Sequence, residues 1–164
     1  MRKTILLLVA LAIVLGMIFI PRTVAVVEEK QIERQEQQLK DEQKLLTEKK
    51  VAYLQTKGSP LSNEEATLLV EMPHGDLLIA ISAIESQYCK RQLGYNCWGI
   101  GGDSAYRHYK DFSEAIIDAN NLITRWQAKG RWHTIEDMNC HYVVPCNENW
   151  VRTVNKVLQE LESL

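Results

Sequence analysis

The stretch that decides the fold is DLLIAISAIESQY, residues 76–88. Its apolar side chains with helical spacing are Leu77, Ile81, Ile84 and Tyr88. This spacing predicts an α-helix that buries one face in a protein core. On such a helix Leu78, Ile81 and Glu85 lie three and four residues apart and almost in line. We therefore expect Glu85 at the edge of an apolar stripe, close to the end of the helix.

A carboxylic acid in that position has a specific chemical use. Partial burial disfavours the charged form of a carboxyl group and raises its pKa. An acid that is still protonated near neutral pH can donate its proton to a leaving oxygen, as glycosidic bond cleavage requires. The alternative is that Glu85 points into solvent, as most helical glutamates do. Composition alone favours this second interpretation.

Helices are also predicted on both sides of this stretch. Ser62 and Glu65 form a capping-box pattern that opens an earlier helix. Later helices are expected at about 112–129, with Asp111 and Glu114 as cap partners, after Thr134, and at about 149–161. Residues 89–111 are rich in Gly, Tyr and Asn and predict a long ordered loop with a short hairpin. Residues 61–164 should therefore form a mainly α domain with a small core.

The four cysteines all lie in this domain, in two closely spaced pairs. The pairs are Cys89 with Cys97 and Cys140 with Cys146. In an exported chain such an even set predicts disulfides, and we expect each pair to be bonded. A zinc site that recruits His108, His133 or His141 is the rival interpretation. No Cys-x-x-Cys or His-x-x-x-His spacing supports it, so no metal site is predicted.

The chain begins with two segments of very different character. Residues 1–22 hold an apolar run, residues 4–20, after two positive charges, which predicts a single-pass membrane anchor with a cytoplasmic N-terminus. Thr23-Val24-Ala25 keeps open a cleaved signal peptide and a secreted product. Both interpretations place the C-terminal domain outside the cytoplasm.

Residues 23–60 predict a charged helical stalk. Strong helix formers fill residues 28–50 without Gly or Pro, and Gly58-Ser59-Pro60 ends the segment. Apolar residues recur every seven positions at Ile32, Leu39, Leu46 and Tyr53. The second seam position of a coiled coil is polar throughout, so we expect a solvated stalk with at most weak self-association.

Charge excludes one class of partner. The whole chain has a net charge of -2, and residues 61–164 hold 9 Lys and Arg against 14 Asp and Glu. No basic field is present there to attract DNA or RNA, so no nucleic-acid partner is predicted.

Three segments together resemble the lysozyme-like superfamily. They are Ala80-x-x-x-Ile84-Glu85-Ser86, Asn96-Cys97-Trp98-Gly99-Ile100 and Tyr109-x-x-Phe112-x-x-Ala115-Ile116. Their order and spacing are similar to bacterial peptidoglycan N-acetylglucosaminidases and lytic-transglycosylase-like domains. The resemblance implies an α+β lysozyme-like fold with Glu85 as the catalytic acid. The substrate-binding residues that it implies are Ser86, Asn96, Trp98, Gly99, Tyr109 and Tyr142.

The chain departs from these families in two ways. The Gly-Leu-Met-Gln signature of transglycosylases is absent, and a second carboxylate is not obvious. Asp103 is the candidate for orienting a water, although an ordinary turn aspartate fits equally well. Without it, the sugar's own N-acetyl group or 6-hydroxyl would act as the nucleophile. Trp98 and Tyr106, in the Gly-rich loop, are candidate platforms for a sugar face.

These observations lead to one expected function and one alternative. We expect an exported, membrane-tethered enzyme that needs no cofactor and cleaves peptidoglycan glycan strands. The bonds cut would be β-1,4 bonds between N-acetylglucosamine and N-acetylmuramic acid. The alternative is a non-catalytic cell-wall-binding or envelope-assembly module that keeps the same scaffold.

Overall fold

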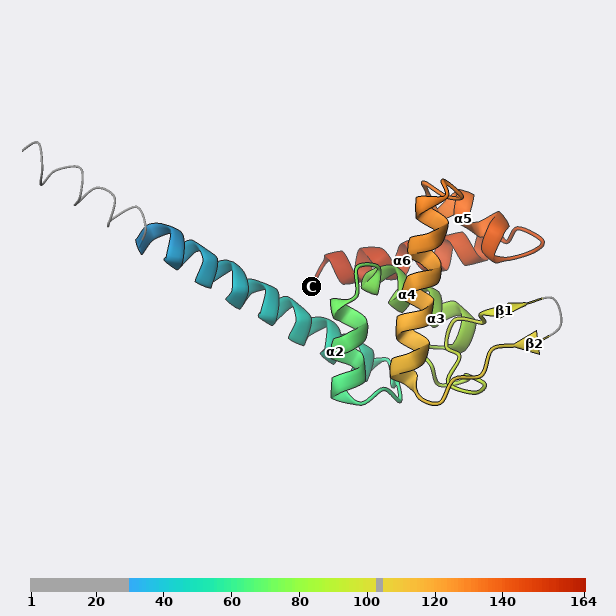
Figure 1. Cartoon of the computed structure of the whole chain (residues 1–164), viewed down its shortest axis with the longest axis horizontal. Helices are drawn as coiled ribbons and strands as arrows, with labels where there is room; N and C mark the ends of the chain where they lie inside the picture. The colour runs from blue at the N-terminus through green and yellow to red at the C-terminus, as the bar shows by residue number, and fades with distance from the viewer. Residues whose placement is uncertain (1–29, 103–104) are drawn as a thin grey trace, which may run out of the picture. The chain divides into compact units, whose positions relative to one another are not determined.

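The computed structural model describes residues 30–102 and 105–164. This part of the chain is mainly helical, as the sequence predicts, and its strands form one short pair. The chain divides into two compact units between Lys44 and Leu45. The larger unit, residues 45–164, holds every element that positions the candidate site (Figure 1).

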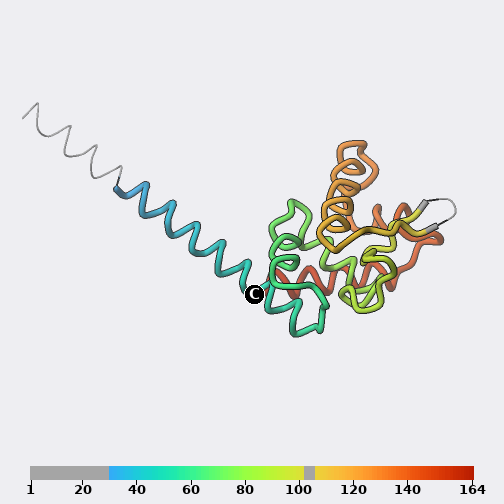
Figure 2. Tube along the Cα trace, turned by 60° about the horizontal axis from the view of Figure 1, so that its bottom comes forward, coloured from blue at the N-terminus to red at the C-terminus, as the bar shows by residue number. Residues whose placement is uncertain are grey.

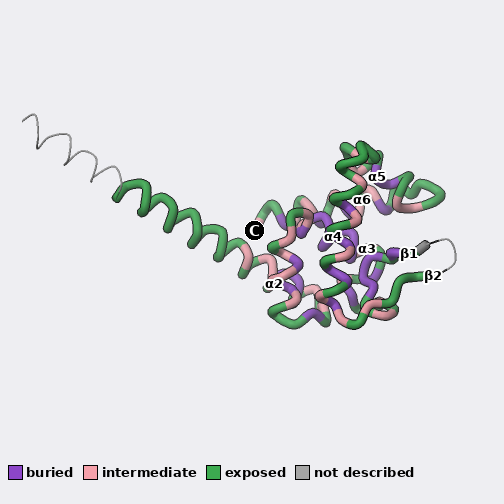
Figure 3. The backbone as a smooth tube through the Cα atoms, in the orientation of Figure 1, coloured by how far each residue is buried: buried purple, intermediate pink, exposed green. Residues whose placement is uncertain are grey.

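The N-terminal helix occupies residues 30–56. Residues 30–46 are exposed throughout, which confirms the predicted solvated character of the stalk for that stretch (Figure 3). Leu39, one of the heptad positions, has a relative exposure of 58%. Self-association through these apolar positions stays a prediction. Among the described helices, none is both long enough and apolar enough to span a membrane, and the predicted anchor at residues 4–20 lies outside the described residues.

The last turns of this helix belong to the larger unit, which corrects the predicted domain boundary at residue 60. Leu54 is 1% exposed, and the Tyr53 hydroxyl donates to a carboxylate oxygen of Glu160 at 2.7 Å. The Tyr53 and Tyr88 hydroxyls lie 3.0 Å apart. The sequence suggested a later end to the stalk, at residue 60, because residues 45–57 keep a mostly polar composition around these few buried positions.

Helix α3 is the centre of the larger unit. The helices are α2 (Asn63–Glu71), α3 (Gly75–Ser86), α4 (Phe112–Ala128), α5 (Ile135–Tyr142) and α6 (Glu148–Glu162). α3 packs most extensively against α6 and also against α2 and α4. Figure 2 shows the course of these helices from a second side. Buried positions run along almost all of α3 and line the inner faces of α4 and α6 (Figure 3). A helix buried on more than one face explains why residues 76–88 are so apolar.

Side-chain caps set the starts of the surrounding helices. Ser62 and Glu65 form the predicted capping box at the start of α2. Asp111 accepts from the Glu114 backbone N–H at 2.8 Å, which confirms the predicted cap of α4. Thr134 caps α5. These bonds satisfy N–H groups that have no partner inside the helix, so each helix begins at a defined residue.

The region between α3 and α4 contains the predicted hairpin. β1 (Gly101–Gly102) pairs with β2 (Ala105–Tyr106) in antiparallel register, with Gly101 opposite Tyr106. Asp103 lies outside the described residues, so its predicted role stays a prediction. The two predicted disulfides, Cys89–Cys97 and Cys140–Cys146, are both present.

The position of the boundary can be tested by removing one leucine side chain on each side of it. Leu54→Ala is expected to destabilise the larger unit by about 2–5 kcal/mol, because it leaves a cavity in the core. Leu39→Ala makes the same chemical change at an exposed site and should alter the free energy of unfolding by no more than about 0.5 kcal/mol. Urea denaturation followed by tryptophan fluorescence measures both. Equal effects of the two substitutions would contradict a core that begins before residue 60.

Candidate active site

A pocket opens at the C-terminal end of α3. It has a volume of about 230 Å³. Its lining residues are Glu85, Arg91, Leu93, Asn96, Gly99 and Tyr106. Glu85 comes from the last turn of α3 and Tyr106 from β2, whereas the others belong to residues 87–100, which we call the post-helix loop. The loop and the hairpin thus surround the one carboxylate that lines the pocket.

Protein surrounds the Glu85 carboxylate on two sides, with a hydrogen bond on one and Gly99 close by on the other. The indole Nε1 of Trp150 donates to Oε1 at 2.9 Å. On the other side, a Cβ placed on Gly99 would lie 3.1 Å from Oε2, closer than most side chains tolerate. Gly99 also has a φ of +61°, so both the backbone conformation and the space beside Glu85 favour glycine at this position. A larger residue here would push against the acid.

The pKa of Glu85 is raised above its ordinary value because burial penalises the charged form. The Trp150 hydrogen bond opposes this effect, because it stabilises the carboxylate. Glu85 is nevertheless an exposed residue overall, less buried than the sequence suggested. The reason is that Glu85 lines the open pocket, whereas its neighbour Ser86 in the same turn stays buried. The acid therefore has a desolvated side and an open side.

The backbone after Glu85 is unusual. Gln87, Tyr88 and Cys89 have φ values of 53°, 58° and 69°, and none of them is glycine. Each such residue costs roughly 1–2 kcal/mol, so the surrounding contacts must hold the turn in place. The Arg91 N–H donates to the Ser86 carbonyl at 2.9 Å, and the Cys89–Cys97 disulfide closes the turn. The post-helix loop is consequently fixed to the end of α3.

Ser86 acts inside this turn, not in the pocket. Its side chain is buried, and its hydroxyl donates to the Cys97 carbonyl at 2.7 Å and accepts from the Cys89 N–H at 3.0 Å. A second contact of the hydroxyl reaches the Ser82 carbonyl at 3.1 Å. These partners use its hydrogen-bonding capacity, which corrects the predicted substrate contact. Ser86 positions the loop that borders Glu85.

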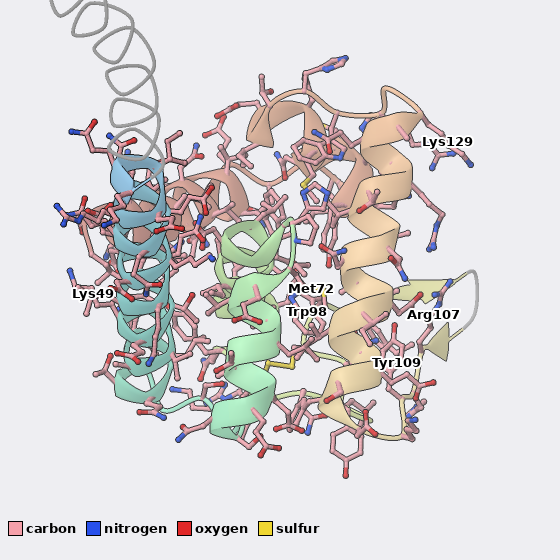
Figure 4. The ribbon with its side chains drawn as sticks, turned by 60° about the vertical axis from the view of Figure 1, so that its left-hand side comes forward. Lys49, Met72, Trp98, Arg107, Tyr109 and Lys129 are labelled. Carbon is pink, nitrogen blue, oxygen red and sulfur yellow. A yellow bond between two sulfur atoms is a disulfide. The ribbon has the colours of Figure 1, made fainter. Side chains whose placement is uncertain are left out.

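Asn96 and Trp98 are also buried, although Asn96 borders the pocket. The Asn96 amide donates to the Ile100 carbonyl at 2.7 Å and to the Arg107 carbonyl at 3.1 Å, and it accepts from the Ile100 N–H at 3.0 Å. It therefore ties the loop to the hairpin strand. Trp98 lies in the interior between the helices (Figure 4), with its indole N–H on the Leu78 carbonyl at 2.8 Å. Its predicted role as a sugar platform is corrected, because its ring is enclosed by the core.

Tyr142 joins the acid to an aromatic cluster. Its ring packs against Trp150 at a centroid distance of 5.6 Å and against Trp126 at 6.0 Å. Its hydroxyl donates to the Trp98 carbonyl. Burial and the nearby Glu85 charge raise the pKa of Tyr142. Tyr142, which was predicted to bind substrate, is therefore within electrostatic reach of Glu85, behind Trp150.

Tyr109 is held beside α4, away from the pocket lining. Its hydroxyl donates to Asp118 at 2.8 Å, and Arg107 pairs with the same carboxylate oxygen at 2.6 Å. Figure 4 shows Tyr109 and Arg107 together between α4 and the hairpin. Burial and the bond to Asp118 raise the pKa of Tyr109. This arrangement supports the wall of the site, and it places Tyr109 outside the residues that line the pocket.

The sequence missed three features of the site. Trp150 is not among the predicted site residues, but a buried indole N–H needs an acceptor, and that rule could have identified a partner. Arg91 and Leu93 belong to no recognisable sequence motif, so nothing in the sequence indicated that they would line the pocket. Leu93 is 62% exposed and Tyr106 is 60% exposed, so both present apolar surface at the pocket. Of the predicted site residues in the described part of the chain, Glu85, Asn96, Gly99 and the candidate platform Tyr106 line the pocket.

All four cysteines form disulfides, so none of them is available as a thiolate ligand for the alternative zinc site. Within residues 30–102 and 105–164, no group of three or more His, Cys, Asp and Glu side chains is placed to hold a metal ion.

The influence of Trp150 on the acid can be measured directly. Trp150→Phe keeps most of the ring but removes the N–H donor, so the pKa of Glu85 should rise further. Trp126→Phe removes an indole that packs on Tyr142 but makes no hydrogen bond to Glu85, and it should leave that pKa nearly unchanged. Carbon-13 NMR titration of the glutamate carboxyl groups gives both values, and the spectrum of Glu85→Gln identifies the resonance. An unchanged pKa in Trp150→Phe would refute the hydrogen bond.

Comparisons of the chain with protein-family models, with curated proteins and with solved structures found no match.

Proposed function

We propose that the chain is an exported enzyme that cleaves the β-1,4 bonds of peptidoglycan glycan strands, with Glu85 as the general acid. The observation that carries this proposal is the environment of Glu85. It borders an open pocket, burial raises its pKa, and a single indole N–H fixes its orientation. Such an acid keeps its proton to a higher pH than a solvated glutamate does.

The proposed first step is proton transfer to the bridging oxygen. A glycan strand in the pocket would place that oxygen against the open side of Glu85. The proton moves from the carboxyl group to the oxygen while the bond between the sugar C1 and that oxygen breaks. The carboxylate that remains is stabilised by the Trp150 N–H. The same bond that lowers the pKa of Glu85 thus helps the acid to lose its proton in the transition state.

The nucleophile that completes the reaction is an open part of the proposal. Among the described residues that line the pocket, Glu85 is the one acidic side chain. With one carboxylate, the oxygen of the sugar's N-acetyl group or its 6-hydroxyl attacks C1 from within the substrate. With Asp103 as a second carboxylate, a water would attack instead. Attack by the 6-hydroxyl, which gives its proton to the Glu85 carboxylate, leaves an anhydro sugar. Attack by the N-acetyl oxygen forms a cyclic oxazolinium that water then opens, so this route and direct attack by water both leave a reducing end.

The pocket surface also suits a sugar. Leu93 and Tyr106 expose apolar side chains beside Glu85, and flat sugar faces pack on such surfaces. Of the two platforms that the sequence suggests, Trp98 and Tyr106, it is Tyr106 that borders the pocket and that we propose for this role. The exposed helical residues 30–44 and the apolar run before them support tethering of this domain to a membrane, as part of the same proposal.

The decisive experiment uses Glu85→Gln. The substitution keeps the size of the side chain and removes the transferable proton, so glycan cleavage should fall by about 10²–10⁴-fold. Glu162→Gln, at the exposed end of α6, makes the same change away from the pocket and should retain wild-type activity. Release of soluble fragments from purified sacculi is followed by mass spectrometry. If Glu85→Gln cleaves as fast as wild type, Glu85 is not the acid.

The same assay separates the enzyme from the alternative module. A wild-type chain that binds sacculi without releasing fragments would support a wall-binding or assembly role and contradict the enzyme. Fragments that end in N-acetylglucosamine, in N-acetylmuramic acid or in an anhydro sugar identify the bond and the nucleophile.

The pH profile gives an independent check. A general acid must be protonated, so kcat/KM should fall as pH rises through the pKa of Glu85, which lies above the ordinary value of 4.5. Trp150→Phe should move this descending limb to higher pH, because it removes the bond that lowers the pKa. A limb that does not move in this variant would assign the titration to another group.

A further inference from the structure

Arg91 shares the pocket with Glu85 and has no partner in the part of the chain that the structure describes. Its side chain is exposed, whereas its backbone N–H is bonded to the Ser86 carbonyl at 2.9 Å. The base of the side chain is therefore fixed and its guanidinium is available. Arg107, the next arginine along the chain, differs because Asp118 already pairs with it at 2.6 Å.

No ion pair joins Arg91 to Glu85. Burial, which raises the pKa of Glu85, and the Trp150 hydrogen bond, which lowers it, together account for the shift of that pKa. Arg91 is thus not needed to explain the state of Glu85. The other lining residues are uncharged, namely Leu93, Asn96, Gly99 and Tyr106. The pocket consequently offers one acid, one unpartnered cation and apolar surface. A planar guanidinium of this kind binds carboxylates through two parallel hydrogen bonds.

We propose that Arg91 binds a carboxylate on the glycan strand and makes the site selective for strands that contain muramic acid. This inference rests on the proposed function. N-acetylmuramic acid differs from N-acetylglucosamine by a lactyl ether at C3. The two sugars alternate in peptidoglycan, so every β-1,4 bond has a muramic acid on one side. In a strand without peptides, a lactyl carboxylate therefore lies within one sugar ring of any bond that Glu85 cleaves.

The carboxylate has two sources in the wall. In strands that have lost their peptides, the lactyl group itself ends in a free carboxylate. In strands that carry peptides, the lactyl carboxylate is in an amide bond and the acidic groups belong to the peptide. Both present the same chemistry to Arg91, and defined substrates can distinguish them.

The test measures binding and cleavage by the full-length chain in detergent. Three oligosaccharides of equal length are compared: peptide-free strands with lactyl carboxylates, strands with stem peptides, and neutral chito-oligosaccharides. Arg91→Gln removes the cation of the pocket. Lys90→Gln is the matched control, because Lys90 is the neighbouring exposed cation and its ammonium contacts the Lys57 carbonyl at 2.9 Å.

Binding is measured in the Glu85→Gln background, so it does not depend on catalysis. Arg91→Gln should weaken the binding of an anionic strand about tenfold and leave the binding of chito-oligosaccharides unchanged. Lys90→Gln should change neither. The loss should shrink in high salt, because an exposed charge contact is screened. In the chain that keeps Glu85, kcat/KM for the anionic strand should fall by a similar factor.

Each outcome has a definite meaning. A loss on peptide-free strands identifies the lactyl carboxylate, and a loss on peptide-bearing strands alone identifies the stem peptide. Equal losses on neutral and anionic strands, or no loss on any, would overturn the proposal for Arg91. Arg91-dependent binding without any cleavage by the chain that keeps Glu85 would support the carboxylate site while contradicting the proposed enzyme.

Discussion

The hydroxyl group of Ser86 is the contact on which the site depends. It joins the last turn of α3 to the two ends of the post-helix loop, through the Cys89 N–H and the Cys97 carbonyl. The disulfide between the same two cysteines makes the connection covalent. Because three successive residues after Ser86 adopt left-handed backbone conformations, this turn would relax without such restraints. The restraints hold Gly99 against Glu85, and therefore they define the wall of the pocket.

A second constraint sets the state of the acid. Burial on one side destabilises the Glu85 carboxylate, and the Trp150 N–H stabilises it. The two effects together leave the pKa of Glu85 raised. The Trp150 N–H still provides a hydrogen-bond donor for the negative charge that appears on Glu85 after proton transfer. Trp150 can do this because α6 packs more extensively on α3 than any other helix does. The closing helix of the fold is therefore part of the site, although it contributes no residue to the pocket lining.

Much of the fold could be predicted from the sequence because it follows local rules. The apolar spacing of α3 and α6, the caps at Ser62 and Asp111, and the short cysteine separations each depend on nearby residues. The site was predicted less completely because its geometry depends on contacts between distant segments. Trp98 has the composition of a sugar platform, but packing against α3 turns its ring inward, and no local pattern reveals that. The same applies to the bond between Trp150 and Glu85, which joins residues 65 positions apart.

The separation of Arg91 from Glu85 gives the pocket two chemical functions at once. A cation paired with a carboxylate would hold that carboxylate in its charged form and prevent it from acting as an acid. Here the two side chains share a pocket without an ion pair, because Glu85 comes from the helix and Arg91 from the far side of the strained turn. Glu85 can therefore keep its proton while Arg91 remains open to an anion. The turn that Ser86 restrains thus supports both the proposed reaction and the proposed selectivity, because it joins the helix that carries Glu85 to the loop that carries Arg91.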